Sequence, residues 1–444
     1  MVYSSNHSNT YVSNCSRKCI LIILLLLNAL IGVIYYIHGQ KEDGINANTR
    51  ATNALLHRRQ HNLHGFETIK PIESIKKTLE NEYNHDDLMN FYNHVQKEYS
   101  LGLKCTRVKI TPATPIKLNV TEQIKNNTRL ISAKFSSLVS STTRSYSRRF
   151  QRTNFHTFII DNSNACLNDS VDLVIIIISK SNNFKTRDAI RRTWASGKDL
   201  GIYSSINIKY FFLIDFDEKL SHNMRLENNI FRDIIQVELP EQYTLVTQRV
   251  LSLIEWSFRY CRTAKYLFKT DDDIFVNLML LLKFISSLIK TPTNNSFLIS
   301  DMKIYGYQHI TATVFRQASD PVGIRYIVTV DEYPCKLYPT FLSGFGYLIS
   351  KKARDAILYA AYQDVEPFRI SDVYFTGIIP DYLSIPRQPL SNYSIRFSGT
   401  CDNFFNGSTA FACADSSHHG NTSDVFNKFN QYWQLVKQKH RIFS

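Results

Sequence analysis

No C-x-x-C pair occurs among the eight cysteines of this 444-residue sequence. Because structural zinc sites commonly use that spacing, its absence argues against a zinc module. No internal repeat is present either, so a solenoid or a propeller is not expected. The length exceeds the need of one ordinary domain, and a chain of this size can bury a large core.

Acidic residues are scarce between residues 104 and 152. This stretch holds eleven Lys or Arg and one acid, Glu122, and it contributes +10 to the formal net charge of +14. A nucleic-acid-binding face would spread its charge over a fold. A basic stretch rich in Ser, Thr and Asn is more typical of a solvated tether. The composition therefore predicts no nucleic-acid partner.

Charge is absent from residues 20–37, ILIILLLLNALIGVIYYI. These eighteen residues approach the roughly 20 that a helix needs to cross a bilayer. Arg17 and Lys18 precede them, and such a positive flank stays cytoplasmic. A cleaved signal peptide is the alternative, but the run is long for one and no clean cleavage site follows. We predict a cytoplasmic tail at 1–19, a signal-anchor helix at 20–37 and a lumenal remainder.

The cysteines and the glycosylation acceptors agree with a lumenal location. Six cysteines follow the predicted anchor, and an even number suggests disulfides, with Cys401 and Cys413 as the first candidate pair. Cys15 and Cys19 precede the anchor and are candidates for palmitoylation or simple apolar residues. After the predicted anchor, N-x-S/T triplets occur at seven positions: Asn119, Asn126, Asn168, Asn294, Asn392, Asn406 and Asn421.

Two regions follow the predicted anchor. Residues 38–154 show little periodicity, and we expect a partly disordered stem with a helix around 72–98. From 155 to 444 we expect one catalytic domain. There, apolar strand-like runs such as VDLVIIIIS at 171–179 alternate four times with helical patterns, as at 245–261. This alternation predicts an α/β fold, a mostly parallel sheet with helices on both faces.

Three consecutive aspartates, Asp271, Asp272 and Asp273, end the fourth predicted strand. In such sheets ligands bind at the carboxyl ends of the strands. The flanking YLFK and IFV should be buried, and buried like charges are costly unless a cation neutralises them. We therefore predict a divalent metal that bridges phosphate. The alternatives are a solvated turn and an N-cap by Asp273 for a helix starting near Val276.

Five ordered blocks, from about residue 155 to the C-terminus, resemble the β-1,3-glycosyltransferase family of type II Golgi membrane proteins. They are RDAIRRTW (187–194), IEWSFRYC (254–261), YLFKTDDDIFVN (266–277), YPTFLSGFGYLIS (338–350) and SDVYFTG (371–377). The resemblance implies a glycosyltransferase A-type fold. It also implies inverting β-1,3 transfer of Gal, GlcNAc or GalNAc from a UDP-sugar to a glycan acceptor, with Mn²⁺ as cofactor.

The resemblance also implies roles for the acidic residues. Asp271 and Asp273 are the expected metal ligands, and Asp271 and Asp272 the expected donor contacts. Asp372 is the expected general base, since its apolar neighbours would raise its pKa; a helix N-cap is the alternative. His418 or His419, with His419 preferred, is expected to complete the metal shell.

Other donor-site candidates keep an alternative structural role. Arg187 and Arg191 share a helical face and suit the diphosphate or uracil of a donor, or else lie on a solvated face or form internal salt bridges. Tyr338, Gly344 and Gly346 suit a sugar pocket, or else a bulged core strand. The same block of sequence as Arg191 contains Trp194, which we expect in the core.

The sequence departs from the family pattern at two positions. Ser371 replaces the Glu that usually precedes the base, and Leu245 replaces an Asn in EQYTLVTQR (241–249), where Arg249 keeps the cation. These departures leave open a second hypothesis, a catalytically weak relative that binds glycans or supports another transferase.

Overall fold

The computed structural model describes residues 70–101, 154–167, 169–200, 205–289, 294–318, 321–363, 367–389, 401, 412–414 and 425–440. All of them belong to one compact unit, Lys70–Ser444. None of the helices in these ranges is long and apolar enough to cross a membrane. The predicted anchor at 20–37, Cys15, Cys19, His418, His419 and every predicted glycosylation acceptor except Asn294 lie outside these ranges.

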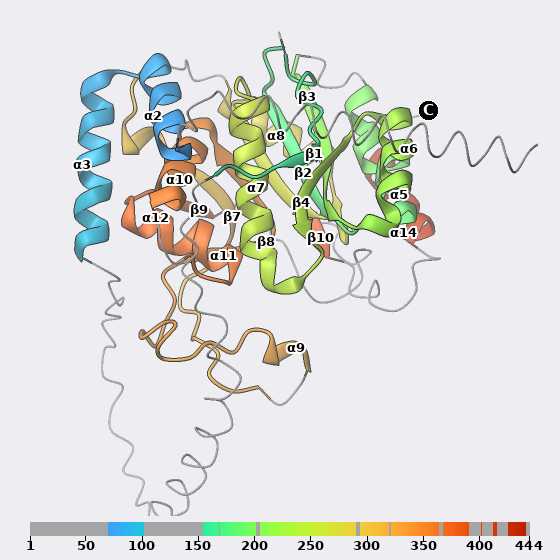
Figure 1. Cartoon of the computed structure of the whole chain (residues 1–444). Coiled ribbons are helices and arrows are strands. Elements are labelled where there is room, and N and C mark those ends of the chain that lie inside the picture. Colours follow the sequence, from blue (N-terminus) through green and yellow to red (C-terminus); the bar gives the residue numbers. More distant parts are fainter. Residues whose placement is uncertain are drawn as a thin grey trace, which may run out of the picture. The chain divides into compact units, whose positions relative to one another are not determined.

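An eight-stranded sheet forms the centre of the unit, in the order β1-β4-β3-β2-β5-β8-β7-β9 (Figure 1). The strands are β1 (Phe158–Ile160), β2 (Leu173–Ser179), β3 (Ile208–Phe216), β4 (Ile234–Pro240), β5 (Tyr266–Asp271), β7 (Ile304–His309), β8 (Phe341–Ser350) and β9 (Arg387–Pro389). The pairs β4–β3, β3–β2, β2–β5 and β7–β9 are parallel. The pairs β1–β4, β5–β8 and β8–β7 are antiparallel. The predicted α/β class and its mostly parallel sheet are confirmed.

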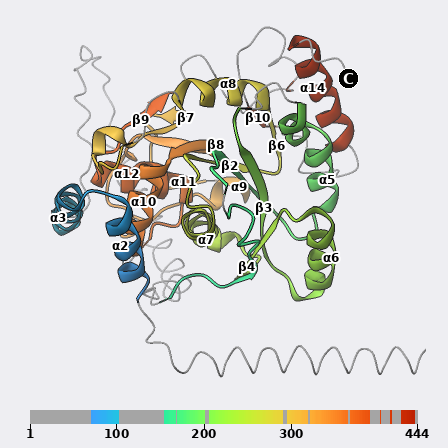
Figure 2. The ribbon, with the colours of Figure 1, turned by 90° about the horizontal axis from the view of Figure 1, so that it is seen from above.

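Helices cover both faces of this sheet (Figure 2). The longer ones are α2 (Pro71–Glu82), α3 (His85–Leu101), α5 (Phe184–Arg192), α6 (Ser221–Phe231), α7 (Val246–Tyr260), α8 (Leu278–Leu288), α10 (Lys351–Gln363) and α14 (Val425–Lys439). Short helices are α9 (Pro321–Ile324), α11 (Ser371–Val373) and α12 (Ile379–Tyr382), with a π-helical turn at Tyr374–Ile378 between the last two. Turns of 3₁₀ helix occur at Trp194–Leu200, Glu218–Leu220, Tyr243–Leu245 and Ile299–Asp301.

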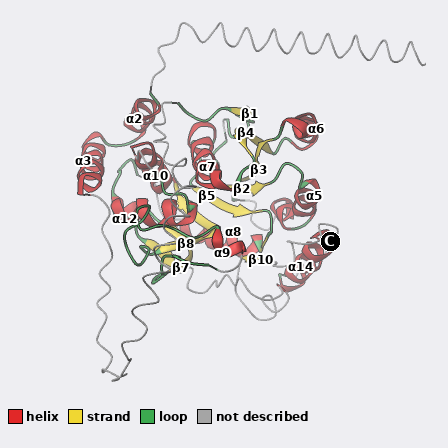
Figure 3. Cartoon of the chain, turned by 60° about the horizontal axis from the view of Figure 1, so that its bottom comes forward, coloured by secondary structure: helices red, strands yellow, loops and turns green. Residues whose placement is uncertain are grey.

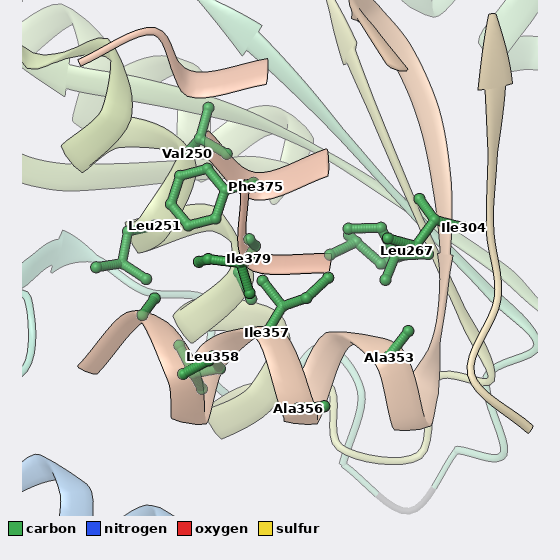
Figure 4. Close-up of a cluster of buried hydrophobic side chains, with 14 of the residues drawn as sticks. Val250, Leu251, Leu267, Ile304, Ala353, Ala356, Ile357, Leu358, Phe375 and Ile379 are labelled. Carbon is green, nitrogen blue, oxygen red and sulfur yellow. The ribbon is translucent and has the colours of Figure 1, made fainter. Parts of the chain in front are cut away.

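Two apolar cores lie on the two faces because strand side chains alternate in direction. In β2, Val174 and Ile176 belong to one core, which includes side chains of α2, α3, α7 and α10. Ile175 and Ile177 belong to the other, with side chains of α5, α8 and α14. Figure 4 shows part of the first core, which includes Leu267 of β5 and Ile357 of α10.

The helix pair α2–α3 packs onto the first core (Figure 3). Ile75 and Leu79 of α2 are fully buried, and Phe91 of α3 is 3% exposed. The sequence places these residues in the predicted stem, whereas the compact unit begins at Lys70. The helix expected around 72–98 exists as two helices joined at residues 83–84.

Disulfides lie at two sites in the described chain. Cys401 and Cys413 are paired, as expected from their separation of 12 residues. Cys166 and Cys261 are joined across 95 residues, which ties the chain before β2 to the end of α7. Cys335 is disulfide-bonded as well.

Candidate active site

The three aspartates lie at the carboxyl edge of the parallel strands. In the β2–β5 register, Ile178 stands opposite Asp271, and the Asp272 amide donates to the Ile178 carbonyl at 3.0 Å. β2 ends one residue later, at Ser179. This edge is where α/β sheets bind ligands, and the structure places the predicted site there.

Asp272 faces the start of α5. Its Oδ2 accepts hydrogen bonds from Ser179 Oγ at 2.7 Å and from Asn183 Nδ2 at 2.9 Å. Burial raises the pKa of this carboxyl, while the two hydrogen bonds oppose that rise. Both bonds favour the carboxylate form, so Asp272 also fixes the loop between β2 and α5 against the end of β5.

Asp273 is a second aspartate whose charged form is disfavoured in the folded protein. Burial, followed by the charges of Asp271 and Asp272, raises the pKa of Asp273 to about 7. Strand β6 (Ile274–Val276) follows it directly, and Asn277 caps α8 by accepting from the Leu280 amide. The alternative of an N-cap by Asp273 is therefore wrong. The position is one that a cation would stabilise.

Lys269 joins the aspartates to the neighbouring strand. Its Nζ donates to Asp271 Oδ1 at 2.7 Å and to the Gly344 carbonyl of β8. The Lys269 side chain is 6% exposed and that of Asp271 is 35% exposed. Sequence reasoning did not select Lys269, although it opens the K-x-D-D-D block. Its ammonium is a positive charge held between the aspartates and β8.

Asp372 approaches the aspartates through Gly344. β8 runs antiparallel to β5, with Gly346 opposite Thr270. A Cβ added at Gly344 would lie 3.3 Å from Asp372 Oδ2, so only glycine permits this approach without displacement. Together with the Lys269–Gly344 bond, this contact brings the predicted base and the predicted metal site to the two sides of one strand segment.

The Asp372 carboxyl is itself partly buried. Burial raises its pKa, whereas the Val373 amide, which donates to Oδ1 at 2.9 Å, and the charge of Lys269 lower it. Ile370 is the N-cap of α11, so the N-cap alternative for Asp372 is wrong. Thr376 fixes the following turn: its Oγ1 donates to the Asp372 carbonyl at 2.5 Å and accepts from the Leu342 amide at 2.8 Å.

Arg187 and Arg191 take part in a buried ion-pair network. Arg187 is fully buried and forms two hydrogen bonds to Glu227, at 2.8 and 2.7 Å. Arg191 pairs with Glu227 at 2.7 Å and with Asp233 at 2.8 Å. The structure thus favours the internal-salt-bridge alternative over contact with a diphosphate. Arg187 contacts the site only indirectly. Ser179 Oγ accepts a hydrogen bond from Arg187 at 3.1 Å and donates one to Asp272.

Trp194 and Gly346 have packing roles. Trp194 is fully buried in the second core, as expected. A Cβ at Gly346 would lie 3.4 Å from the Phe268 ring, so Gly346 packs inside the sheet. Gly344 and Gly346 both lie in β8, as the strand alternative expects, and the pairing of β8 with β7 shifts register between Gly306 and Gln308.

Two tyrosines interact electrostatically with Asp372. Tyr338 is 4% exposed, and its hydroxyl has no hydrogen-bond partner among the described residues. Tyr243 is 48% exposed and hydrogen-bonded to Tyr326, with the Arg325 guanidinium 5.2 Å from its ring centre. The charge of Asp372 contributes to the raised pKa of both Tyr243 and Tyr338. Aromatic and cationic groups therefore surround the approach to this carboxyl.

Residues 241–249 contact β3 and the loop after β2. Arg249 pairs with Asp215 of β3, with Nε 2.8 Å from Oδ1, and Glu241 accepts from Ser181 Oγ at 2.9 Å. Arg249 thus keeps a cation at the position that the family pattern gives to Lys, but its charge is directed to Asp215.

The aspartates suit a hard divalent cation in part. Carboxylate oxygens are the preferred ligands of such ions. The pKa of Asp273 is raised by burial and then by the charges of Asp271 and Asp272, which Lys269 only partly offsets. In the described ranges, however, no group of three His, Cys, Asp or Glu side chains is arranged to hold a metal. Further ligands would have to come from the substrate or from His419.

The fold and this edge define an α/β protein with an acidic ligand site at the carboxyl ends of its parallel strands. Residues 185–391 match the profile of the galactosyltransferase family, described as "Galactosyltransferase". Over these residues the chain is similar to that family.

Individual relatives agree. The chain is 30% identical over 241 residues to the UDP-GalNAc:beta-1,3-N-acetylgalactosaminyltransferase 1 of Homo sapiens, a match that covers 53% of this chain and 66% of the relative. It is 29% identical over 251 residues to the lactosylceramide 1,3-N-acetyl-beta-D-glucosaminyltransferase of Xenopus tropicalis, over 55% and 62% of the two chains. The match therefore spans slightly less than two thirds of these relatives.

A solved structure is also similar. It is a glycosyltransferase involved in the glycosylation of the major capsid of PBCV-1, with 12% identity, 59% of this chain and 99% of that chain covered, and a TM-score of 0.31. A score this low supports no conclusion.

Proposed function

We propose that this protein is an inverting, UDP-sugar-dependent hexosyltransferase of glycosyltransferase A-type fold. It moves Gal, GlcNAc or GalNAc to a glycan hydroxyl in β-1,3 linkage. The observation that carries the proposal is the convergence of Asp372 and the aspartates 271–273 on the Lys269–Gly344 contact. The match to the galactosyltransferase family and the names of the relatives support the same activity.

The proposed reaction is a single displacement. Asp372 accepts the proton of the acceptor hydroxyl while the hydroxyl oxygen bonds to the anomeric carbon of the donor sugar. The bond from that carbon to the β-phosphate oxygen breaks on the opposite face, and UDP leaves with the electron pair. Because burial raises the pKa of Asp372, the carboxylate is a stronger proton acceptor than an exposed aspartate.

Asp271 and Asp273 would hold a divalent cation, Mn²⁺ or a similar ion, with His419 as a further proposed ligand. When bound, such an ion supplies Lewis-acid stabilisation of the leaving diphosphate. Lys269 orients Asp271, and the Ser179 and Asn183 bonds orient Asp272 toward the β2–α5 loop. The donor is therefore proposed to lie along the edge between β2 and β5.

The acceptor is proposed to enter past Tyr243 and Tyr326. Both side chains are exposed, at 48% and 40%, and Arg325 lies against Tyr243. Aromatic faces pack on the C–H surfaces of sugars, while phenol and guanidinium groups donate to hydroxyls. The acceptor hydroxyl would thus reach Asp372 past these aromatic side chains.

The location is part of the proposal. The apolar run 20–37, its basic flank and the lumenal cysteines support a single-pass type II protein of the Golgi membrane, with the catalytic domain in the lumen. Two of the pairs expected of an oxidising compartment are present, Cys166–Cys261 and Cys401–Cys413.

A panel of UDP-sugars tests the proposal. The full-length protein in detergent is incubated with UDP-Gal, UDP-GlcNAc or UDP-GalNAc and a glycan acceptor, and UDP release is measured with Mn²⁺ and with excess EDTA. We expect acceptor-dependent release from one donor that EDTA abolishes. Binding of glycan without release from any donor would instead favour the catalytically weak relative, for which Ser371 and Leu245 are the sequence arguments.

A further inference from the structure

A hollow of about 500 Å³ lies away from the aspartates, beside the far end of the helical run that begins with Asp372. It is lined by Gln308, Ile310, Thr340, Asp381, Ser384, Ile385, Pro386 and Arg387. These residues come from the end of β7, the start of β8, α12 and the start of β9, elements that lie together in Figure 1. None of them belongs to the site described above.

Two short segments of the chain connect the lining of the hollow to Asp372, the proposed base. Asp381 follows Asp372 by nine residues in the helical run 371–382, which at the α-helical rise of 1.5 Å per residue is at most about 14 Å. On the other wall, Thr340 precedes the β8 residues that Thr376 fastens to the helical run, through its bond from the Leu342 amide at 2.8 Å. The hollow therefore keeps a fixed position relative to Asp372.

The lining of the hollow contains one acidic and one basic side chain, and they pair with each other. Arg387 donates to Asp381 Oδ1 at 3.2 Å and to the Ile385 carbonyl at 3.1 Å. The side chain of Asp381 is 46% exposed, and that of Arg387 is 11% exposed. An anion such as phosphate would meet this carboxylate, and a cation would meet the guanidinium, so the pair favours a neutral ligand with both donors and acceptors.

Polar side chains that line the hollow have unused hydrogen-bonding groups. Within the described residues, the Thr340 and Ser384 hydroxyls form no side-chain hydrogen bond, and Gln308 uses its amide N–H on the Arg387 carbonyl at 2.6 Å, leaving its oxygen as an acceptor. Ile310, 67% exposed, adds an apolar surface beside these groups. Hydrogen-bonding groups around an apolar surface match the hydroxyls and the C–H face of a sugar ring.

We propose that this hollow is a second carbohydrate subsite, which holds a non-reacting sugar of an extended glycan acceptor while its terminal hydroxyl lies at Asp372. The proposal rests on the proposed function, since it assigns to the same reaction an acceptor longer than a disaccharide. Binding of remote substrate parts of this kind raises the occupancy of the productive geometry at the reacting centre.

The test compares two acceptors, an N-acetyllactosamine disaccharide and the linear tetrasaccharide of two such units. The full-length protein is assayed with the donor that supports turnover. We expect the KM of the unaltered enzyme to be about tenfold lower for the tetrasaccharide. In Ile310→Ala and Asp381→Asn, we expect the KM for the tetrasaccharide to rise about fivefold to tenfold more than that for the disaccharide.

Matched controls are available on other faces. Ile230→Ala removes an isoleucine that is 73% exposed on α6, and Asp169→Asn alters a carboxylate that is 43% exposed and paired with Lys209. Neither should change the ratio of the two KM values. Equal KM values for both acceptors in the unaltered enzyme, or equal effects of Ile310→Ala and Ile230→Ala, would overturn the subsite.

A binding measurement separates this inference from the proposed function. Saturation-transfer NMR without donor should show contact to the inner sugars of the tetrasaccharide, weakened in Ile310→Ala. If no donor is turned over but this contact is present and lost in the variant, the subsite stands and the transferase proposal fails. If turnover occurs without any dependence on acceptor length, the transferase proposal stands and the subsite fails.

Discussion

Asp273 should destabilise the metal-free protein at neutral pH. Its pKa is raised from 3.8 to about 7 by burial and by its two neighbouring carboxyls. Below pH 4 it is protonated in both the folded and unfolded chains and has no effect. Between pH 4 and 7 the folded state binds the proton more tightly, so its stability falls as pH rises. Above pH 7 the free energy of unfolding is lower by the full amount that corresponds to this pKa difference, about 4 kcal/mol.

The substitution Asp273→Asn removes this loss, because an amide does not ionise. In EDTA, we expect the variant to be more stable than the unaltered protein at pH 8, by up to about 4 kcal/mol, and equally stable at pH 4. Urea unfolding of residues 70–444, the compact unit, followed at both pH values, measures this. Asp331→Asn, at an exposed carboxylate on another loop, is the control and should change neither value.

Added Mn²⁺ and UDP should reverse the order. The unaltered protein gains stability from binding, in proportion to ligand concentration over its dissociation constant, whereas Asp273→Asn should gain little. The reasoning is refuted if Asp273→Asn is no more stable than the unaltered protein at pH 8 in EDTA. An equal gain from Mn²⁺ and UDP in both proteins would remove Asp273 from the metal site but leave its electrostatic strain intact.

Three further predictions concern the base, its approach and the N-terminal helices. Asp372→Asn should keep UDP-sugar affinity, measured by calorimetry, and lose about 10²-fold or more in kcat, and normal turnover would exclude Asp372 as the base. Gly344→Ala places a methyl group 3.3 Å from the Asp372 carboxyl, so kcat should fall about tenfold or more with the fold intact by circular dichroism; unchanged kcat would show that this approach is not needed. Leu79→Ala, at a fully buried position of α2, should cost about 2–5 kcal/mol of unfolding free energy, while Met89→Ala, 42% exposed on α3, should cost under about 1; equal costs would argue that α2 does not belong to the cooperative unit.

The sequence predicts the parallel half of the sheet well because its signal is local. β2 and β3 are continuous apolar runs, as strands buried on both faces must be, and both appear at the expected positions. The Cys401–Cys413 pair was also accessible from sequence, since only 12 residues separate the two. The Cys166–Cys261 pair spans 95 residues and depends on where α7 ends against the start of β2, which no local pattern encodes.

The features that the sequence did not predict have long-range causes. An N-cap by Asp273 is reasonable for a chain that goes directly from strand to helix. Instead Ile274–Val276 forms β6, because Ala412–Ala414 (β10) returns from more than 130 residues away to pair with it. Likewise α2 is fastened by partners distant in sequence: Glu82 pairs with Arg262 at 2.6 Å, and the Tyr83 hydroxyl donates to Asp355 at 2.8 Å. Neither partner can be inferred from the composition around residue 80.

The catalytic proposal depends on the one arrangement that the sequence could not supply. Asp271 and Asp372 are 101 residues apart, and each alone is ambiguous between a site residue and a structural one. β8 lies antiparallel to β5, and this places Gly344 where its carbonyl meets Lys269 and its missing side chain admits Asp372. Lys269 then lies between the two groups of carboxylates and lowers the pKa of both Asp273 and Asp372, although burial keeps both above the ordinary value. This arrangement of charges suits a donor whose leaving group is negatively charged. It also supplies a carboxylate that can accept a proton.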